Sequence, residues 1–165
     1  MSKPSHNNFT VKFANVNGTG SSSANGMFMK SIFRMGIPVV GKNYFPSNIQ
    51  GLPTWYEIRA SEKGYLSPSG TVDIMVAMNA QTYAEDLASV EPGGYLIYDS
   101  SWPRKELMTR DDITVLGVPL AKMCNEAFDT ARSRTLMKNT AYVGVLSALL
   151  EMDMAVIEQL LLDTF

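Results

Sequence analysis

A turn of small residues is the first feature of this sequence that could bind a ligand. The tetrapeptide NGTG at positions 17–20 follows a β-rich run and precedes a segment with helical apolar spacing. The N–H groups of a glycine turn and of a helix N-terminus bind anions such as phosphate, pyrophosphate or carboxylate. The turn has neither the G-x-G-x-x-G pattern of dinucleotide-binding proteins nor the lysine of a P-loop. The alternative is a plain strand-to-helix turn, with Ser21 or Ser22 as the N-cap and with positive φ at Gly18 and Gly20.

A second candidate loop lies at positions 44–51, with the sequence YFPSNIQG. Taken alone it predicts an ordinary loop in which Asn48 and Gly51 are turn residues. Both loops are expected to leave the sheet at the carboxyl ends of strands, where parallel sheets form their ligand crevice. The two loops together supply the candidate binding residues, which are Gly18, Thr19, Gly20 and Ser21 in the first loop and Ser47, Asn48, Gln50 and Gly51 in the second.

Two further side chains could take part in chemistry, and each also has a structural explanation. Asp99 follows an apolar strand and could face a ligand or cap a turn or helix. Cys124, the single cysteine, lies in an amphipathic helical pattern, which favours a small buried residue over a reactive thiol. The sequence contains no metal-ligand spacing, no paired-carboxylate motif and no defensible nucleophile–base pair. We therefore predict no catalytic residue and no metal ligand in this chain.

The elements that must position these residues alternate between strand and helix. An α/β domain with three layers (α/β/α) and a largely parallel, Rossmann-like sheet is the fold that this alternation predicts. The irregular segment 41–51 separates two of the strands. The expected strands are 9–16, 38–40, 52–60, 72–78, 95–99 and 113–118, with a PGG turn before the fifth, and the expected helices are 22–35, 79–90, 120–131, 139–150 and 154–165.

Composition narrows the class of protein. The chain has 165 residues, of which 45% are hydrophobic and 18% charged, and its net charge is -2. That charge balance gives no attraction to nucleic acid or to an anionic membrane. The apolar runs are far shorter than the ~20 residues that span a bilayer. Residues 1–8 form a polar tail without the apolar core of a secretion signal, and a single cysteine excludes an internal disulfide, so a cytoplasmic location is expected.

Features of the last helix and of helix 22–35 suggest that the domain has neighbours. The last helix runs to Phe165 without a capping Gly, Asn or Pro. We therefore expect residues 9–165 to be one domain in the N-terminal part of a longer chain. Helix 22–35 carries more apolar residues than one stripe needs, and Leu160, Leu161 and Leu162 have nothing after them to cover them. These surplus apolar residues predict a domain that works inside an obligate complex.

The order of motifs resembles a known family. After NGTGSSSANG come NYFPSNIQGLPTWYEIRAS, YLSPSGTVDIMVAMN and VEPGGYLIYDSS, and then VLGVPLAKMCNEAF and KNTAYVGVLSALLEMDMAVIEQLLLDTF. This chain resembles, from Phe9 to Phe165, the γ domain of the 2-oxoacid:ferredoxin oxidoreductases. The family usually has G-x-G-G-Q-G in its first loop, and here Gly18-Thr19-Gly20 stands at the place of the last Gly-Gln-Gly. In the second loop Pro46-Ser47 matches the 2-oxoglutarate branch, in which the γ domain is often fused in front of the α domain.

The resemblance implies a function for the glycine loop. In this family the γ domain helps to form the coenzyme A site and packs on the α and β parts, while thiamine diphosphate, Mg²⁺ and [4Fe–4S] clusters are held in other domains or subunits of the complex. The whole enzyme converts 2-oxoglutarate, coenzyme A and oxidised ferredoxin to succinyl-CoA, CO₂ and reduced ferredoxin, or runs in reverse. The isolated domain is then expected to be inactive.

Three other functions are compatible with the residues. A pyruvate:ferredoxin oxidoreductase would use the same domain. A stand-alone Rossmann-like dinucleotide enzyme is disfavoured, because no acidic residue suited to a ribose follows the second strand. A purely structural interaction domain would use the glycine loop only as a turn.

Overall fold

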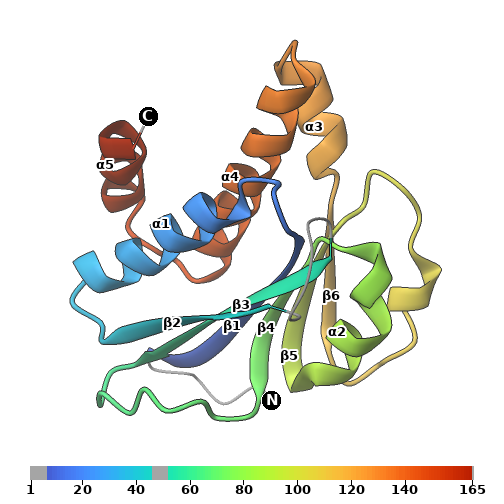
Figure 1. Ribbon diagram of the computed structural model, residues 1–165. Coiled ribbons are helices and arrows are strands. Elements are labelled where there is room, and N and C mark those ends of the chain that lie inside the picture. The colour runs from blue at the N-terminus through green and yellow to red at the C-terminus, as the bar shows by residue number, and fades with distance from the viewer. Residues whose placement is uncertain (1–6, 46–51, 165) are drawn as a thin grey trace.

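The computed structural model describes residues 7–45 and 52–164 and places a six-stranded sheet at the centre of the molecule (Figure 1). The strand order is β2-β3-β1-β4-β5-β6. The strands are β1 (Asn8–Val16), β2 (Val39–Tyr44), β3 (Pro53–Ser61), β4 (Val72–Ala77), β5 (Val90–Asp99) and β6 (Thr114–Val118). The helices are α1 (Ser21–Arg34), α2 (Tyr83–Ser89), α3 (Leu120–Ala127), α4 (Ala131–Leu149) and α5 (Met154–Thr164), with 3₁₀ turns at Ala80–Thr82 and Lys105–Leu107.

The sheet is largely parallel, as predicted. Strand β1 pairs in parallel with β4, β4 with β5, and β5 with β6. Strand β3 is antiparallel to both β1 and β2, so β2 runs in the same direction as β1. Five strands therefore end at one edge of the sheet, which we call the carboxyl edge.

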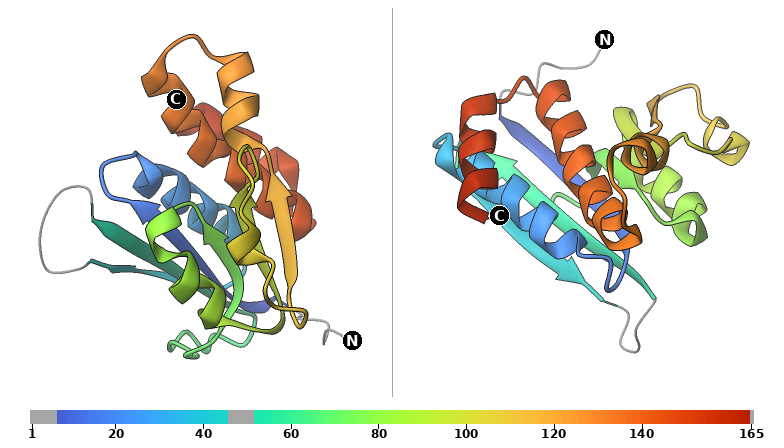
Figure 2. Two further views of the ribbon diagram at one scale, coloured as in Figure 1. Left: turned by 90° about the vertical axis from the view of Figure 1, so that its right-hand side faces the viewer. Right: turned by 90° about the horizontal axis from the view of Figure 1, so that it is seen from above.

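Helices cover the two faces of the sheet unequally (Figure 2). Helices α1, α4 and α5 pack on one face, while α2 packs on β4 and β5 from the other. Alternation along β1 explains the division, because Val11 and Phe13 enter the first core and Ala14 the second. The Phe13 ring lies 5.9 Å from that of Phe28 and 5.7 Å from that of Tyr142. The predicted α/β/α architecture is thus confirmed, with a thin second helical layer.

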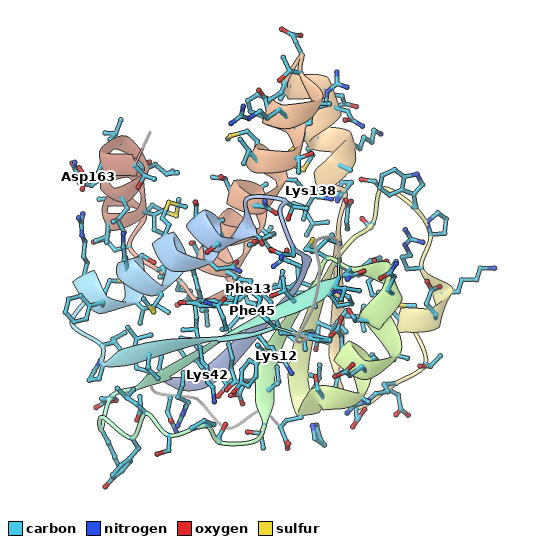
Figure 3. All side chains as sticks on the ribbon, viewed as in Figure 1. Lys12, Phe13, Lys42, Phe45, Lys138 and Asp163 are labelled. Carbon is cyan, nitrogen blue, oxygen red and sulfur yellow. The ribbon has the colours of Figure 1, made fainter. Side chains whose placement is uncertain are left out.

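The face of β1, β2 and β3 that turns away from α1 carries aromatic and basic side chains. The Lys12 ammonium lies 5.6 Å from the Trp55 ring centroid, and Lys42 lies 5.0 Å from that of Tyr44 (Figure 3). Trp55 Nε1 donates a 2.9 Å hydrogen bond to Asp86 of α2. Burial raises the pKa of Asp86, while hydrogen bonds from Thr82 and Trp55 partly oppose this rise. Trp55 is therefore held against α2 at the border of this face.

Several element boundaries differ from the sequence prediction. Strand β2 continues to Tyr44, where an irregular segment was expected after residue 40, because it pairs with β3 along its whole length. Strand β5 begins at Val90 instead of 95, and the expected PGG turn is an irregularity within the strand, with φ of 85° at Gly93. Helix α4 begins at Ala131 instead of 139, since Thr130 accepts a hydrogen bond from the N–H of Ser133 and caps it. Among the described residues, no helix is both long enough and apolar enough to cross a membrane.

Candidate anion-binding site at the carboxyl edge

The glycine loop joins β1 to α1 at the carboxyl edge. Gly18 and Gly20 have φ of 86° and 79°, as predicted, and the Thr19 hydroxyl donates a 2.8 Å hydrogen bond to the Val16 carbonyl. The expectation of a Ser21 or Ser22 N-cap is wrong, because Gly20 is the N-cap and Ser21 is buried as the first helical residue. Since Gly20 has no side chain, no side chain caps the first N–H groups of α1. A bound anion could satisfy these N–H groups.

Helix α4 holds this loop from above. The Asn139 side-chain amide donates a 2.8 Å hydrogen bond to the carbonyl of Thr19, and Asn139 itself is buried. A Cβ atom on Gly20 would press against Cδ2 of Leu136. The hydrogen bond from Asn139 therefore fixes the loop, and a side chain at Gly20 would have to displace the end of the Leu136 side chain. The sequence prediction missed both α4 residues, and the only signal for Asn139 was an amide within an apolar helical pattern.

Two buried amides lie beneath the same edge. Asn15, near the end of β1, alternates onto the same face as Phe13, and it is 2% exposed. Asn79, which follows β4, is 4% exposed. The Asn79 side-chain nitrogen has no hydrogen-bond partner within the described part of the chain, whereas the Asn15 side chain interacts with the Tyr142 hydroxyl and partly opposes the rise that burial gives the pKa of that hydroxyl. The carbonyl oxygen of Asn79 caps the next turn by accepting from the N–H of Gln81 at 3.0 Å. Buried donors without an acceptor are costly, which makes this edge suited to an electron-rich ligand.

Asp99, at the end of β5, is the cap of a neighbouring helix. Its carboxylate accepts from the Ser101 hydroxyl at 2.6 Å and from the N–H of Ala121 at 3.2 Å. Ser101 in turn accepts from the N–H of Lys122 at 2.9 Å. The capping alternative for Asp99 is thus confirmed, and the N-terminus of α3 is closed by protein groups. Nζ of Lys138, from α4, lies 4.0 Å from the Asp99 carboxylate.

The strands that flank the second loop end near the glycine loop. Ser47, Asn48, Gln50 and Gly51 lie outside the described residues. The strands that flank them pair as far as Tyr44 and Trp55, and the N–H of Asn17 donates to the Leu52 carbonyl at 3.3 Å. The hairpin base therefore reaches the same edge of the sheet as the glycine loop.

The described residues suit binding more than bond-making chemistry. No group of three or more His, Cys, Asp or Glu side chains in this part of the chain could hold a metal ion. Cys124 is 4% exposed, and burial raises the pKa of its thiol, so the prediction of a buried residue is confirmed. This edge offers N–H donors at the start of α1, with the Lys138 ammonium group 4.0 Å from Asp99 at the end of β5.

Comparison with known proteins gives a consistent set of matches. The family model for pyruvate ferredoxin/flavodoxin oxidoreductase matches residues 10–165. The α subunit of 2-oxoacid:ferredoxin oxidoreductase 2 from Aeropyrum pernix is 31% identical over 113 residues. This alignment covers 68% of the chain and 17% of the relative, so the chain spans a small part of the length of that protein.

Three solved structures share the fold. A 2-oxoglutarate:ferredoxin oxidoreductase from Magnetococcus marinus, with 2-oxoglutarate, coenzyme A and succinyl-CoA bound, has a TM-score of 0.82 at 24% identity, over 96% of this chain and 27% of that one. A pyruvate oxidoreductase subunit from Thermotoga maritima has a TM-score of 0.77 at 15% identity, over 96% and 86% of the two chains. The γ subunit of a keto/oxoacid ferredoxin oxidoreductase from Geobacter sulfurreducens has a TM-score of 0.73 at 16% identity, over 95% and 86%.

Proposed function

Since the chain belongs to the pyruvate ferredoxin/flavodoxin oxidoreductase family, we propose that it is the γ domain of a 2-oxoacid:ferredoxin oxidoreductase specific for 2-oxoglutarate. The Magnetococcus marinus enzyme, which matches 96% of the chain, acts on 2-oxoglutarate. Pro46-Ser47, which resembles the 2-oxoglutarate branch, also supports this substrate. A pyruvate enzyme is the second candidate, because the Thermotoga maritima subunit has the same fold.

Within that enzyme we assign to the carboxyl edge the binding of coenzyme A. The observation that carries this assignment is the N-terminus of α1, which no side chain caps and which α4 holds in place through the bond from Asn139 to Thr19. Phosphates of the coenzyme fit such an end, since the N–H groups and the helix dipole both favour negative charge. Gly18, Thr19, Gly20 and Ser21 would contribute backbone donors, and we propose that Ser47, Asn48, Gln50 and Gly51 also take part in binding the coenzyme.

The whole enzyme would oxidise 2-oxoglutarate to succinyl-CoA and CO₂ and transfer two electrons to ferredoxin, or catalyse the reverse reaction. Thiamine diphosphate with Mg²⁺ and [4Fe–4S] clusters, held by other domains or subunits, would supply the decarboxylation and electron-transfer chemistry. The donor set of the described residues does not suit those groups, because it contains no metal-ligand cluster and one buried thiol. The contribution of this chain is to bind and orient the acyl acceptor.

Replacing Asn139 with Ala tests the coenzyme role in the assembled enzyme. We expect the KM for coenzyme A to rise about three- to tenfold, because one hydrogen bond that holds the glycine loop is lost. The KM for 2-oxoglutarate should stay unchanged. Asn125→Ala, an exposed amide on α3, is the matched control.

Steady-state kinetics with coenzyme A and 2-oxoglutarate varied in turn provide the measurement. A rise in the KM for 2-oxoglutarate alone would refute the coenzyme assignment. Titration of the wild-type enzyme with NAD provides a second check, because tight binding of NAD in place of coenzyme A would support the dinucleotide alternative.

The surface of the chain supports a role inside a complex with α and β parts, which we place in the cytoplasm. Phe33 of α1 is 69% exposed and Leu162 of α5 is 76% exposed. We expected the Leu160 side chain to be exposed as well, but this is wrong, because it packs into the core beside α1. The aromatic and basic face of β1, β2 and β3 adds a second area that other domains could cover.

Expressed alone, the 165-residue chain should self-associate, and co-expression with the α and β parts should yield one stoichiometric complex. Size-exclusion chromatography with light scattering measures both results. A monodisperse monomer that ignores the co-expressed parts would show that this chain does not depend on them.

A further inference from the structure

Lys138 of α4 is a positively charged residue next to one that contacts the glycine loop. The next residue, Asn139, donates to Thr19, and Leu136 lies against Gly20. The Lys138 ammonium group itself lies 4.0 Å from the Asp99 carboxylate at the end of β5. Helix α4 thus delivers an ammonium group to the edge where α1 begins.

This ammonium group lacks a hydrogen-bond acceptor of its own. Its side chain is 30% exposed, and Nζ lies 4.0 Å from Asp99, which is beyond hydrogen-bonding distance. The Asp99 carboxylate is already occupied by Ser101 and by the N–H of Ala121. Across residues 7–45 and 52–164 no hydrogen bond from Lys138 is found. Apart from the 4.0 Å ion pair with Asp99, the half-buried Lys138 ammonium group therefore has donors that an anion could accept.

The surrounding groups also favour an anion over any other ligand. The N-terminus of α1 presents N–H groups without a side-chain cap. The side-chain nitrogen of Asn79 is buried and unpaired in the described part of the chain. The one carboxylate in this group, Asp99, is turned toward the N-terminus of α3. Uncapped N–H donors and a cation on the helix that contacts the same loop match the charge of a phosphate group.

We propose that Lys138 binds a phosphate group of coenzyme A. In a P-loop, a lysine within the loop provides the positive charge for the phosphate, and the glycine loop of this chain has no such lysine. Lys138 would provide that charge from α4. The inference rests on the proposed coenzyme role of the carboxyl edge. It adds a specific residue and a specific part of the coenzyme, its phosphates, as the determinant of affinity.

Lys138→Met in the assembled enzyme tests the proposal, because Met keeps the buried stem and removes the charge. Isothermal titration calorimetry should show the Kd for coenzyme A rising about tenfold, the effect of one lost charge-assisted hydrogen bond. Pantetheine, which has no phosphate, should bind both enzymes equally. Lys138→Arg should retain most of the affinity, and Lys30→Met, an exposed lysine on α1, is the matched control.

Two further measurements show which phosphate is bound and whether Lys138 has a structural role. With dephospho-CoA, the effect of Lys138→Met persists if the pyrophosphate is bound and disappears if the 3′-phosphate is bound. The thermal midpoint of the assembled enzyme should change little, because the 4.0 Å ion pair between Lys138 and Asp99 is long and partly exposed and so adds little stability. An ion pair with a purely structural role would instead lower the midpoint and leave the Kd unchanged.

The outcomes separate this proposal from the function on which it rests. An unchanged Kd in Lys138→Met, with weaker binding in Asn139→Ala, overturns the role of Lys138 and leaves the coenzyme site in place. Unchanged affinity in both variants overturns both proposals. Failure of Lys138→Met to assemble assigns Lys138 to the fold and likewise overturns the inference.

Discussion

Gly20→Asp should raise the KM for coenzyme A more than tenfold in the assembled enzyme, with a much smaller effect on the KM for 2-oxoglutarate. The new carboxylate would stand at the N-cap of α1, where it would occupy the N–H groups and repel a phosphate. A tenfold change corresponds to about 1.4 kcal/mol, which one like-charge contact can supply. Steady-state kinetics with each substrate varied in turn measures the two constants.

The stability of this variant should change little, which separates the binding effect from unfolding. A side chain at φ of 79° is strained, and its Cβ displaces the tip of Leu136. An aspartate N-cap opposes this cost, because it satisfies helix N–H groups that no side chain now caps. Gly64→Asp is the control, since Gly64 has φ of 75°, open space around it and a place at the opposite edge of the sheet. Equal KM values for both variants would contradict a phosphate site at Gly20.

Phe13→Ala should destabilise the domain by about 3–5 kcal/mol, a large part of the stability of a domain of this size. The Phe13 ring is fully buried at the centre of β1 and contacts the rings of Phe28, Tyr56 and Tyr142. Its removal leaves a cavity where the sheet meets α1 and α4, the two helices that form the candidate site. Chemical denaturation followed by circular dichroism measures the change in the free energy of unfolding.

Phe33→Ala provides the matched comparison, because the same side chain is removed from a position that is 69% exposed. We expect a change of less than about 1 kcal/mol in the free energy of unfolding for this variant. Similar losses in the two variants would show that the core does not lie between β1 and α1.

The local features of the site could be read from the sequence because they depend on neighbouring residues. Positive φ at Gly18 and Gly20 follows from the freedom of glycine in a short turn between a strand and a helix. The alternation in β1 correctly placed Phe13 on a buried face. The type and order of the elements also followed from periodicity, which is a property of each segment alone.

Boundaries that depend on pairing between segments were predicted less well. Residues 41–44 have no strand pattern of their own and become part of β2 because β3 supplies hydrogen bonds along their length. The antiparallel direction of β3 likewise results from the hairpin that it forms with β2. Ser21 is a common N-cap residue, yet the αL conformation of Gly20 moved the cap one position earlier and removed the side chain from it.

Only the tertiary structure decided which side chains complete the candidate site. Asn139 and Lys138 stand about 120 residues from the glycine loop, and no local pattern connects them to it. Their positions depend on how α4 crosses the sheet beside α1, which is set by the packing of Tyr142, Val143 and Leu146 in the shared core. The sequence therefore determined a loop able to bind an anion, while helix packing determined the residues that fix its shape and provide its charge.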